Sequence, residues 1–249
     1  MEDIVVDIND VSLIYHERSG ETPAVDHLSM QVKRGEFVSV VGPSGCGKTS
    51  VLSLIAGIIE PSSGSVSIDG FKPGYMLQRD HLLDWRNVEG NILLGLEVQK
   101  NLTPQTRNCA LGLLDTYGLS AFAKHYPRQL SGGMRQKVAL IRTLATSPDV
   151  LLLDEPFSSL DYQTRLRLSD EVYDIIKNEH KTAILVTHDI SEAISMSDRL
   201  LVFTRRPARI KNEHKISLSR GDTPIARRKA PEFKDYFDVV WKELDVGEV

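Results

Sequence analysis

The 249-residue sequence has few cysteines, little excess charge and no long apolar run, and each deficit excludes a class of protein. Its two cysteines, Cys46 and Cys109, are too few for a disulfide framework, so we expect both to be reduced thiols of a cytosolic protein. A formal net charge of -4 at pH 7 argues against broad nucleic-acid binding, which requires a strongly basic face. We therefore expect no nucleic acid among its partners.

We also expect neither a signal peptide nor a membrane-spanning segment. The first residues, Met1–Ile4, lack the basic start and apolar run of a signal peptide. Apolar runs such as Val150–Leu153 have the length of a strand, far short of the roughly 18 residues that a membrane helix needs. What is present, 41% apolar and 26% charged residues, is ordinary for a soluble protein with a hydrophobic core. We expect any association with a membrane to be made through a partner chain.

Apolar patterning predicts a strand-rich start to the chain. Ile4–Ile8, Val11–Tyr15 and Leu28–Val32 alternate apolar and polar residues, as antiparallel strands with one solvated face do. Phe37–Val41 is mostly apolar, which predicts a strand that is covered on both faces. Ser50–Ala56 then continues as a helix.

The rest of the chain alternates between helices and buried strands. From about residue 80 to residue 146 the pattern is helical, and Thr103 followed by Pro104 predicts the start of one helix. Val150–Leu153 and Thr182–Val186 are predicted to be strands buried on both faces. Gln163–Asn178, between them, has the length of a helix that connects two parallel strands. This order of elements indicates an α/β protein.

A glycine-rich loop directly follows the first buried strand and begins the next helix. It consists of Gly42-Pro43-Ser44-Gly45-Cys46-Gly47-Lys48-Thr49 and matches the phosphate-loop pattern G-x-x-x-x-G-K-[ST] without deviation. Its glycines allow successive backbone N–H groups to surround phosphate oxygens, a geometry that a Cβ would obstruct. We expect Lys48 to contact the β- and γ-phosphates of ATP, Thr49 to ligate Mg²⁺, and Ser50 to add a nucleotide contact.

Two carboxylates come directly after a later buried strand. Asp154 and Glu155 follow Val150–Leu153, at the carboxyl end of a strand, where open α/β sheets bind their ligands. We expect Asp154 to hold Mg²⁺ and Glu155 to be the general base that polarises the attacking water. A helix cap without catalytic function is the alternative role for such a pair.

Leu130–Gln136 contains a second predicted anion site. Its Ser131-Gly132-Gly133 precedes a helical pattern, so the serine can cap the helix and the glycines leave backbone N–H groups accessible. This heptapeptide resembles the signature sequence of ATP-binding-cassette (ABC) ATPases, and the other motifs of that family occur in order over about residues 4–210. Met134 stands where glutamine is most common in the family, a substitution associated with some importer ATPases.

The resemblance implies an α/β fold with a RecA-like phosphate-loop core, an antiparallel β subdomain and an α-helical subdomain at about residues 80–146. The ABC domain is expected to span residues 1–210, followed by a short C-terminal extension at residues 211–249. One helix of the extension is expected to pack on its own domain through an apolar stripe of Phe233, Phe237, Val240, Trp241 and Leu244. In the family, the signature of one subunit closes on the phosphate loop of another, so that a head-to-tail homodimer encloses two ATP molecules.

Four smaller motifs acquire roles only through the resemblance. Ser158–Asp161 resembles the D-loop, which links the two nucleotide sites across the dimer and places Asp161 near the nucleotide. His188 matches the switch histidine that contacts the γ-phosphate. Gln78 corresponds to the Q-loop glutamine, a ligand of Mg²⁺ or of water at the hinge to the helical subdomain. Tyr15 fits the aromatic residue that stacks on adenine, with simple packing as the alternative.

The leading hypothesis is the ATPase subunit of a bacterial-type ABC importer, peripheral at the cytoplasmic face of the membrane. Its expected partners are a second copy, a separate integral-membrane permease and, indirectly, an extracytoplasmic solute-binding protein. Leu82–Arg86 and Arg206–Ile210 look most like the nitrate/sulfonate/taurine importer group. A soluble ABC ATPase that is not linked to transport is the alternative, and a simple phosphate-loop kinase has no use for Leu130–Gln136.

Three local features have competing interpretations. Trp85 lies near the transporter's coupling helices if the resemblance holds, or packs in the core. The cluster Arg227–Lys229 is either a solvated loop or a contact for lipid head groups. Cys46 is either a small residue tolerated at a variable position or a site of redox regulation, and as a thiol beside the phosphate site we expect it to be alkylated unless ATP protects it.

Overall fold

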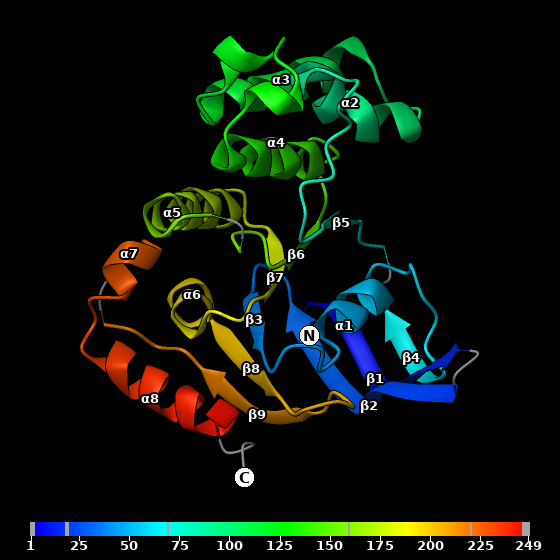
Figure 1. The fold of residues 1–249 in the computed structure, drawn as a ribbon, viewed down its shortest axis with the longest axis vertical. Coiled ribbons are helices and arrows are strands. Elements are labelled where there is room, and N and C mark those ends of the chain that lie inside the picture. The colour runs from blue at the N-terminus through cyan, green and yellow to red at the C-terminus, as the bar shows by residue number, and fades with distance from the viewer. Residues whose placement is uncertain (1–2, 18–19, 69, 159, 220, 246–249) are drawn as a thin grey trace.

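The computed structural model describes residues 3–17, 20–68, 70–158, 160–219 and 221–245. Its strands are β1 (Ile4–Glu17), β2 (Gly20–Lys33), β3 (Phe37–Val41), β4 (Ser63–Ser67), β5 (Pro73–Met76), β6 (Val150–Asp154), β7 (Thr182–Val186), β8 (Arg199–Phe203) and β9 (Ile210–Lys215). Its α-helices are α1 (Lys48–Ile55), α2 (Val88–Val98), α3 (Pro104–Thr116), α4 (Gly132–Leu144), α5 (Tyr162–Asn178), α6 (Ile190–Met196), α7 (Pro224–Arg227) and α8 (Glu232–Asp245). Figure 1 shows α2, α3 and α4 as a layer of their own beyond α5 and the sheets.

The larger sheet carries the phosphate loop and has the strand order β5-β6-β7-β3-β8-β9. Its neighbouring strands are parallel except for β9, which is antiparallel to β8. Every residue of β3, β6 and β7 is buried, as expected for parallel strands that are covered on both faces. The strands predicted at Phe37–Val41 and Thr182–Val186 are confirmed, and α5 connects β6 to β7 as predicted.

The smaller sheet is antiparallel, with the order β2-β1-β4. The two alternating runs predicted as separate strands, Ile4–Ile8 and Val11–Tyr15, belong to one long strand, β1. Its pairing with β2 shifts in register between Ile8 and Val11, where Asp10 has a φ of 51°. Such a bulge bends a strand without ending its pairing, and alternation in the sequence does not distinguish it from a turn.

The helical layer packs through α2 and α4. Thr103 caps α3 as predicted, because its Oγ1 accepts a hydrogen bond from Thr106 N at 3.1 Å, and Pro104 is the first helical residue. Ile92 and Leu140 are buried in a core that continues beneath α5 and into one face of the larger sheet. The layer is therefore attached to the sheet by apolar packing as well as by the chain itself.

The segment after residue 210 is built into the main sheet, since it begins with β9 at the sheet edge. Helix α8 packs against α6 and β8, burying Val240 fully and Phe233, Phe237 and Leu244 partly. Trp241 belongs to the predicted apolar stripe but is 54% exposed, and its ring stacks on that of Phe237 at a centroid distance of 6.0 Å. The expectation that this helix packs on its own domain is thus confirmed.

The short helix α7 fixes the chain between β9 and α8. Its Arg227 is only 8% exposed, donating hydrogen bonds to Tyr173 Oη at 2.8 Å and to the Ser197 carbonyl oxygen at 2.7 Å. Arg227 is therefore neither solvated nor accessible to lipid head groups. Both interpretations of the cluster Arg227–Lys229 are wrong for this residue. Lys229 is exposed, as both assumed.

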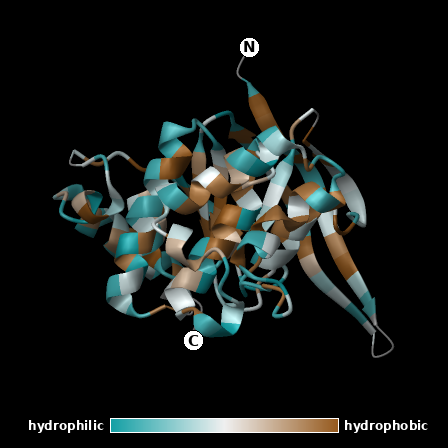
Figure 2. Cartoon of the chain, turned by 90° about the horizontal axis from the view of Figure 1, so that it is seen from above, coloured by the Kyte–Doolittle hydropathy of each residue, from teal (hydrophilic) through white to brown (hydrophobic). Residues whose placement is uncertain are grey.

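Apolar residues collect inside the fold. Figure 2 shows hydrophobic segments gathered in the middle of the molecule and hydrophilic ones toward its periphery. Within the described ranges, no helix combines the length and the apolar character needed to cross a membrane.

Candidate nucleotide-binding site

The phosphate loop lies between the carboxyl end of β3 and the start of α1, the strand–loop–helix context that its motif requires. Gly47 is the residue before α1 and has a φ of 122°. A Cβ at this position would lie 2.5 Å from the Ala24 carbonyl oxygen and 3.1 Å from Ala208 Cβ. Both its backbone conformation and its neighbours therefore require glycine.

Lys48 is the first residue of α1, and its ammonium group lies against the backbone of the phosphate loop. Its side chain is buried, and Nζ donates to the carbonyl oxygens of Gly42 at 2.7 Å and Pro43 at 3.0 Å. Carbonyl dipoles satisfy the donors but do not neutralise the ammonium. The loop thus presents a buried positive charge together with the free N–H groups of a helix start, which favours an anionic ligand.

An open cavity of about 490 Å³ lies in front of the loop. It is lined by Ser44, Gly45, Gly47, Lys48, Thr49, Ser50, Gln78, Glu155, His188 and Arg206. Nine of these ten are residues that the sequence assigned to the site. Arg206 is the exception. It was not predicted as a site residue, and only belongs to Arg206–Ile210, the segment that resembles one group of importers.

Asp154 does not itself line the cavity, but it is hydrogen-bonded to Thr49, which does. Thr49 Oγ1 donates to Asp154 Oδ1 at 3.2 Å, and the Tyr75 hydroxyl donates to Asp154 Oδ2 at 3.4 Å. Burial raises the pKa of the Asp154 carboxyl, and the adjacent charge of Glu155 raises it further, while the Thr49 hydrogen bond lowers it. Burial also raises the pKa of Tyr75 to about 12, so this hydroxyl keeps its proton. Tyr75, from the edge strand β5, was not predicted as part of the site.

The side chain of Glu155 lies close to Gln78 and His188, which come from two other loops of the chain. Gln78 Nε2 donates to Glu155 Oε2 at 2.9 Å, and His188 Nδ1 lies 3.3 Å from the same oxygen. The backbone of Glu155 has a φ of 45°, unusual for a residue with a side chain, and its N–H donates to the Val186 carbonyl oxygen at 2.8 Å. The strained backbone turns the carboxylate out of the strand direction and into the cavity.

Comparisons with known proteins agree with this geometry. Residues 25–158 match the family model described as ABC transporter. The chain is 46% identical to the uncharacterized ABC transporter ATP-binding protein YtlC of Bacillus subtilis, over 96% of this chain and 95% of that one. The chain belongs to the ABC transporter family of ATP-binding proteins.

Other relatives of this ABC protein are named for import. The nitrate import ATP-binding protein NrtD of Synechocystis is 36% identical, with 94% of this chain and 93% of that protein covered. The taurine import ATP-binding protein TauB of Yersinia pestis is 37% identical, with 95% and 98% covered. Among solved structures, a dimeric post-hydrolysis state of the ATP-binding cassette MJ0796 bound to ADP and Pi has a TM-score of 0.75 at 29% identity. That match covers 85% of this chain and 99% of the other.

The signature segment of this ABC protein does not line the cavity. Ser131 caps α4, accepting a hydrogen bond from Met134 N at 3.3 Å, and both Ser131 and Gly132 are exposed. A Cβ on Gly133 would lie 2.8 Å from Thr164 Cγ2, which explains the absence of a side chain there. Within one chain, the two predicted anion sites therefore remain apart.

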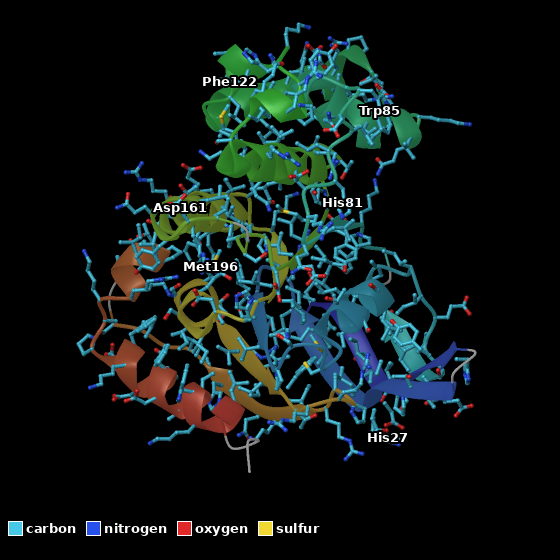
Figure 3. The ribbon with its side chains drawn as sticks, in the orientation of Figure 1. His27, His81, Trp85, Phe122, Asp161 and Met196 are labelled. Carbon is cyan, nitrogen blue, oxygen red and sulfur yellow. The ribbon has the colours of Figure 1, made fainter. Side chains whose placement is uncertain are left out.

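The other assigned positions outside the cavity lining are Gly42, Pro43, Cys46, Asp154, Asp161 and Tyr15. Asp161 caps α5 by accepting from Thr164 N at 3.1 Å, and hydrogen bonding by the Thr164 side chain and then by its backbone lowers the pKa of the exposed Asp161 carboxyl (Figure 3). Ser159, in the same predicted D-loop, lies outside the described residues. Tyr15 is half-buried in the core under the antiparallel sheet, and its hydroxyl lies 3.1 Å from Ser50 Oγ. The tyrosine thus packs and also borders the site through Ser50.

An ion pair that the sequence did not reveal joins the Q-loop to the signature helix. Arg135, in the signature, donates from Nε to Asp80 Oδ2 at 2.9 Å and from Nη2 to Asp80 Oδ1 at 3.2 Å. Burial raises the pKa of Asp80, but the hydrogen bonds from Arg135 and Leu82 N, together with the charges of Arg135 and Arg142, outweigh it and the pKa is lowered. Arg142 adds hydrogen bonds to the carbonyl oxygens of Asp80 at 2.7 Å and His81 at 2.8 Å. These contacts therefore join the Q-loop to α4.

Cys46 is less accessible than its place in the loop suggests. Its side chain is 1% exposed, and burial raises the pKa of its thiol although the Lys48 charge lowers it. Because the thiolate is the reactive species, the low accessibility of the side chain and its raised pKa both protect this cysteine from alkylation. The structure thus contradicts the expectation of a vulnerable thiol at Cys46, whereas Cys109 is exposed.

We expect thiol titration to separate the two cysteines. With a chromogenic disulfide reagent and no nucleotide, Cys46 should react at least about 10-fold more slowly than Cys109, because it is buried and protonated. The variant Cys109→Ser should therefore lose the fast phase, and Cys46→Ser should retain it. A fast thiol in Cys109→Ser that ATP protects would restore the original expectation.

Proposed function

We propose that the chain is the ATP-hydrolysing subunit of an ABC importer and that it couples ATP-driven dimerisation to solute uptake through a separate permease. The observation that carries this proposal is the position of Glu155 in front of the phosphate loop, held by Gln78 and near His188. The import names of two relatives support the direction of transport. Those names cite two different solutes, nitrate and taurine.

The side-chain oxygen atoms at and beside the phosphate loop suit Mg²⁺. A hydroxyl from Thr49, a carboxylate from Asp154 and the amide oxygen of Gln78 are the hard ligands that this ion prefers, with water and phosphate in the remaining positions. In the part of the chain that is described, no cluster of three histidine, cysteine or acidic side chains offers a metal site of the other common kind. When bound, Mg²⁺ would neutralise charge that develops on the phosphates.

The chain's own residues supply binding and general-base catalysis. The loop N–H groups and Lys48 bind the phosphates, with Lys48 exchanging its carbonyl partners for phosphate oxygens. Glu155 orients the attacking water and accepts its proton on the carboxylate. Gln78 and His188 fix the direction of that carboxylate, and His188 contacts the γ-phosphate. Tyr15, whose hydroxyl lies 3.1 Å from Ser50 Oγ, is expected to stack on the adenine.

The second half of the site comes from another copy of the chain. Ser131, Gly132 and Gly133 at the start of α4 present free N–H groups and a capping hydroxyl away from the cavity of their own chain. We infer that they close on the nucleotide of a second subunit, as do the D-loops with Asp161. The dimeric state of the related MJ0796 cassette supports this arrangement.

The surface for the permease lies beside the Q-loop. Trp85 is 75% exposed, which excludes core packing for its ring, and it projects from the helical layer near α2 (Figure 3). An exposed tryptophan is a typical anchor of a protein interface. We infer a peripheral location at the cytoplasmic face of the membrane and, beyond the permease, an extracytoplasmic solute-binding protein.

Mixing two inactive variants tests the shared site. Lys48→Ala removes the phosphate-loop cation, and Ser131→Arg blocks the signature, so each homodimer is expected to lack hydrolysis. A mixture forms heterodimers with one intact composite site, so ATPase activity should recover to as much as about a quarter of the parent value. Failure to recover, with both variants folded and dimeric by sedimentation, would contradict the composite site.

A further inference from the structure

The turn between β8 and β9, residues 204–209, lies against the phosphate loop. Ala208 N donates to the Ala24 carbonyl oxygen at 2.9 Å, and Asp26 N donates to the Ala208 carbonyl oxygen at 3.0 Å. These bonds attach the turn to β2, beside which it runs in Figure 1. Ala208 also occupies the space beside Gly47, where a Cβ would lie 3.1 Å away. The turn and the loop are therefore packed as one unit.

The turn is also held internally. Thr204 N donates to the Arg209 carbonyl oxygen and Arg209 N donates to Thr204 Oγ1, each at 3.0 Å. The Thr204 hydroxyl in turn donates to the Pro207 carbonyl oxygen at 3.0 Å, and Arg209 forms an ion pair with Asp26. A turn fixed in this way positions the two residues at its tip, Arg205 and Arg206, before any ligand arrives.

The two arginines at the tip face different spaces. Arg206 lines the cavity in front of the phosphate loop, together with Lys48 and Thr49. Arg205 lines a separate hollow beside Pro43 and the end of α8. Both are exposed, and no described residue forms a hydrogen bond or an ion pair with Arg206. An unpaired guanidinium thus faces a cavity that already favours anions.

We propose that Arg206 binds a phosphate group of the nucleotide, as a second cationic side chain of the site beside Lys48. This inference rests on the proposed nucleotide binding. A guanidinium matches phosphate oxygens with paired N–H donors, and such charge-assisted bonds are stronger than those between neutral groups.

Strand order indicates which phosphates are involved. In the larger sheet β6 and β7 lie on one side of β3, and β8 lies on the other. Glu155 and His188, which mark the reacting γ end, follow β6 and β7, whereas Arg206 follows β8. Arg206 thus approaches the loop from the side opposite the reacting end. It binds the phosphates that ATP and ADP share.

Nucleotide titrations with a matched pair of variants test this assignment. Arg206→Ala should raise the Kd of both ATP and ADP by about 10-fold, because one charge-assisted contact is lost. Arg205→Ala, one residue away and outside the cavity, should change neither Kd by more than about twofold. Arg206→Lys should recover part of the affinity, and the defect of Arg206→Ala should shrink at high salt. Melting temperatures should stay equal to the parent value.

The outcomes distinguish this inference from the proposal on which it rests. If the parent protein binds neither ATP nor ADP, nucleotide binding itself is wrong. If the parent binds and Lys48→Ala does not, but Arg206→Ala matches Arg205→Ala, only the role of Arg206 is wrong. A loss of ATP affinity with ADP affinity unchanged, or a lowered melting temperature that accounts for the defect, would also overturn it.

Discussion

Replacing Glu155 by glutamine is expected to slow ATP hydrolysis by about 100- to 10,000-fold, the contribution of a positioned general base. Glutamine keeps the shape of the side chain and can still accept a hydrogen bond from Gln78, so ATP binding should survive. Closed dimers that cannot hydrolyse ATP should accumulate. We would measure steady-state phosphate release, nucleotide affinity, and sedimentation with and without ATP. The exposed Glu60→Gln is the matched control and should behave as the parent.

This prediction depends on the geometry around one oxygen atom. Glu155 Oε2 lies 2.9 Å from Gln78 Nε2 and 3.3 Å from His188 Nδ1, so the carboxylate is oriented by two segments outside its own strand. Hydrolysis by Glu155→Gln at the parent rate would show that another group accepts the proton. Loss of nucleotide binding together with turnover would indicate instead that Glu155 shapes the pocket.

Replacing Arg227 by methionine is expected to destabilise the fold by about 2–4 kcal/mol, since two buried partners lose their hydrogen bonds. Tyr173 is 6% exposed and Ser197 is fully buried, so water cannot replace the guanidinium readily. For a chain of this size the melting temperature should fall by roughly 5–15 °C. Lys229→Met, an exposed neighbour in the same cluster, is the control and should shift it by no more than about 2 °C. Equal melting temperatures for the two variants would show that α7 is held by other contacts.

The effect of Arg227 should extend beyond stability. Arg227 bridges Tyr173 of α5 and Ser197 at the end of α6. Helix α5 follows the D-loop, and α6 follows His188. Near their starts the two helices are joined by an ion pair of 3.1 Å between Arg165 Nη1 and Asp189 Oδ2. The segment after residue 210 thus helps to set the positions of two loops of the site.

Local patterns in the sequence were sufficient for the elements that depend on local chemistry. Phe37–Val41 and Thr182–Val186 were predicted correctly because strands covered on both faces are apolar throughout. The phosphate loop was recognisable because glycine spacing reports a backbone conformation, as the φ of 122° at Gly47 shows. The cap of α3 at Thr103 follows the same rule.

Features that depend on long-range pairing were not predictable in this way. The Asp80–Arg135 ion pair joins residues 55 positions apart, and Tyr75 reaches Asp154 across 79. The position of Arg206 is set by contacts between its turn and Ala24, far away in sequence. Residue type alone also misjudged burial, since Arg227 is inside and Trp241 is half outside. Periodicity indicates which face of an element is apolar, but it does not indicate what covers that face.

The antiparallel strand β9 has a consequence for shortened forms of the protein. It pairs with β8 from Arg199 to Phe203 and so occupies the backbone donors and acceptors along that edge of the sheet. A chain cut at residue 210 would leave these groups unpaired beside a strand whose side chains are almost wholly apolar. Such an edge invites pairing with strands of other molecules, so removing the extension would favour aggregation. The same cut would release one end of the turn that carries Arg206. The position of Arg206 in the nucleotide site would then be less well fixed, although the deleted residues lie outside the cavity lining.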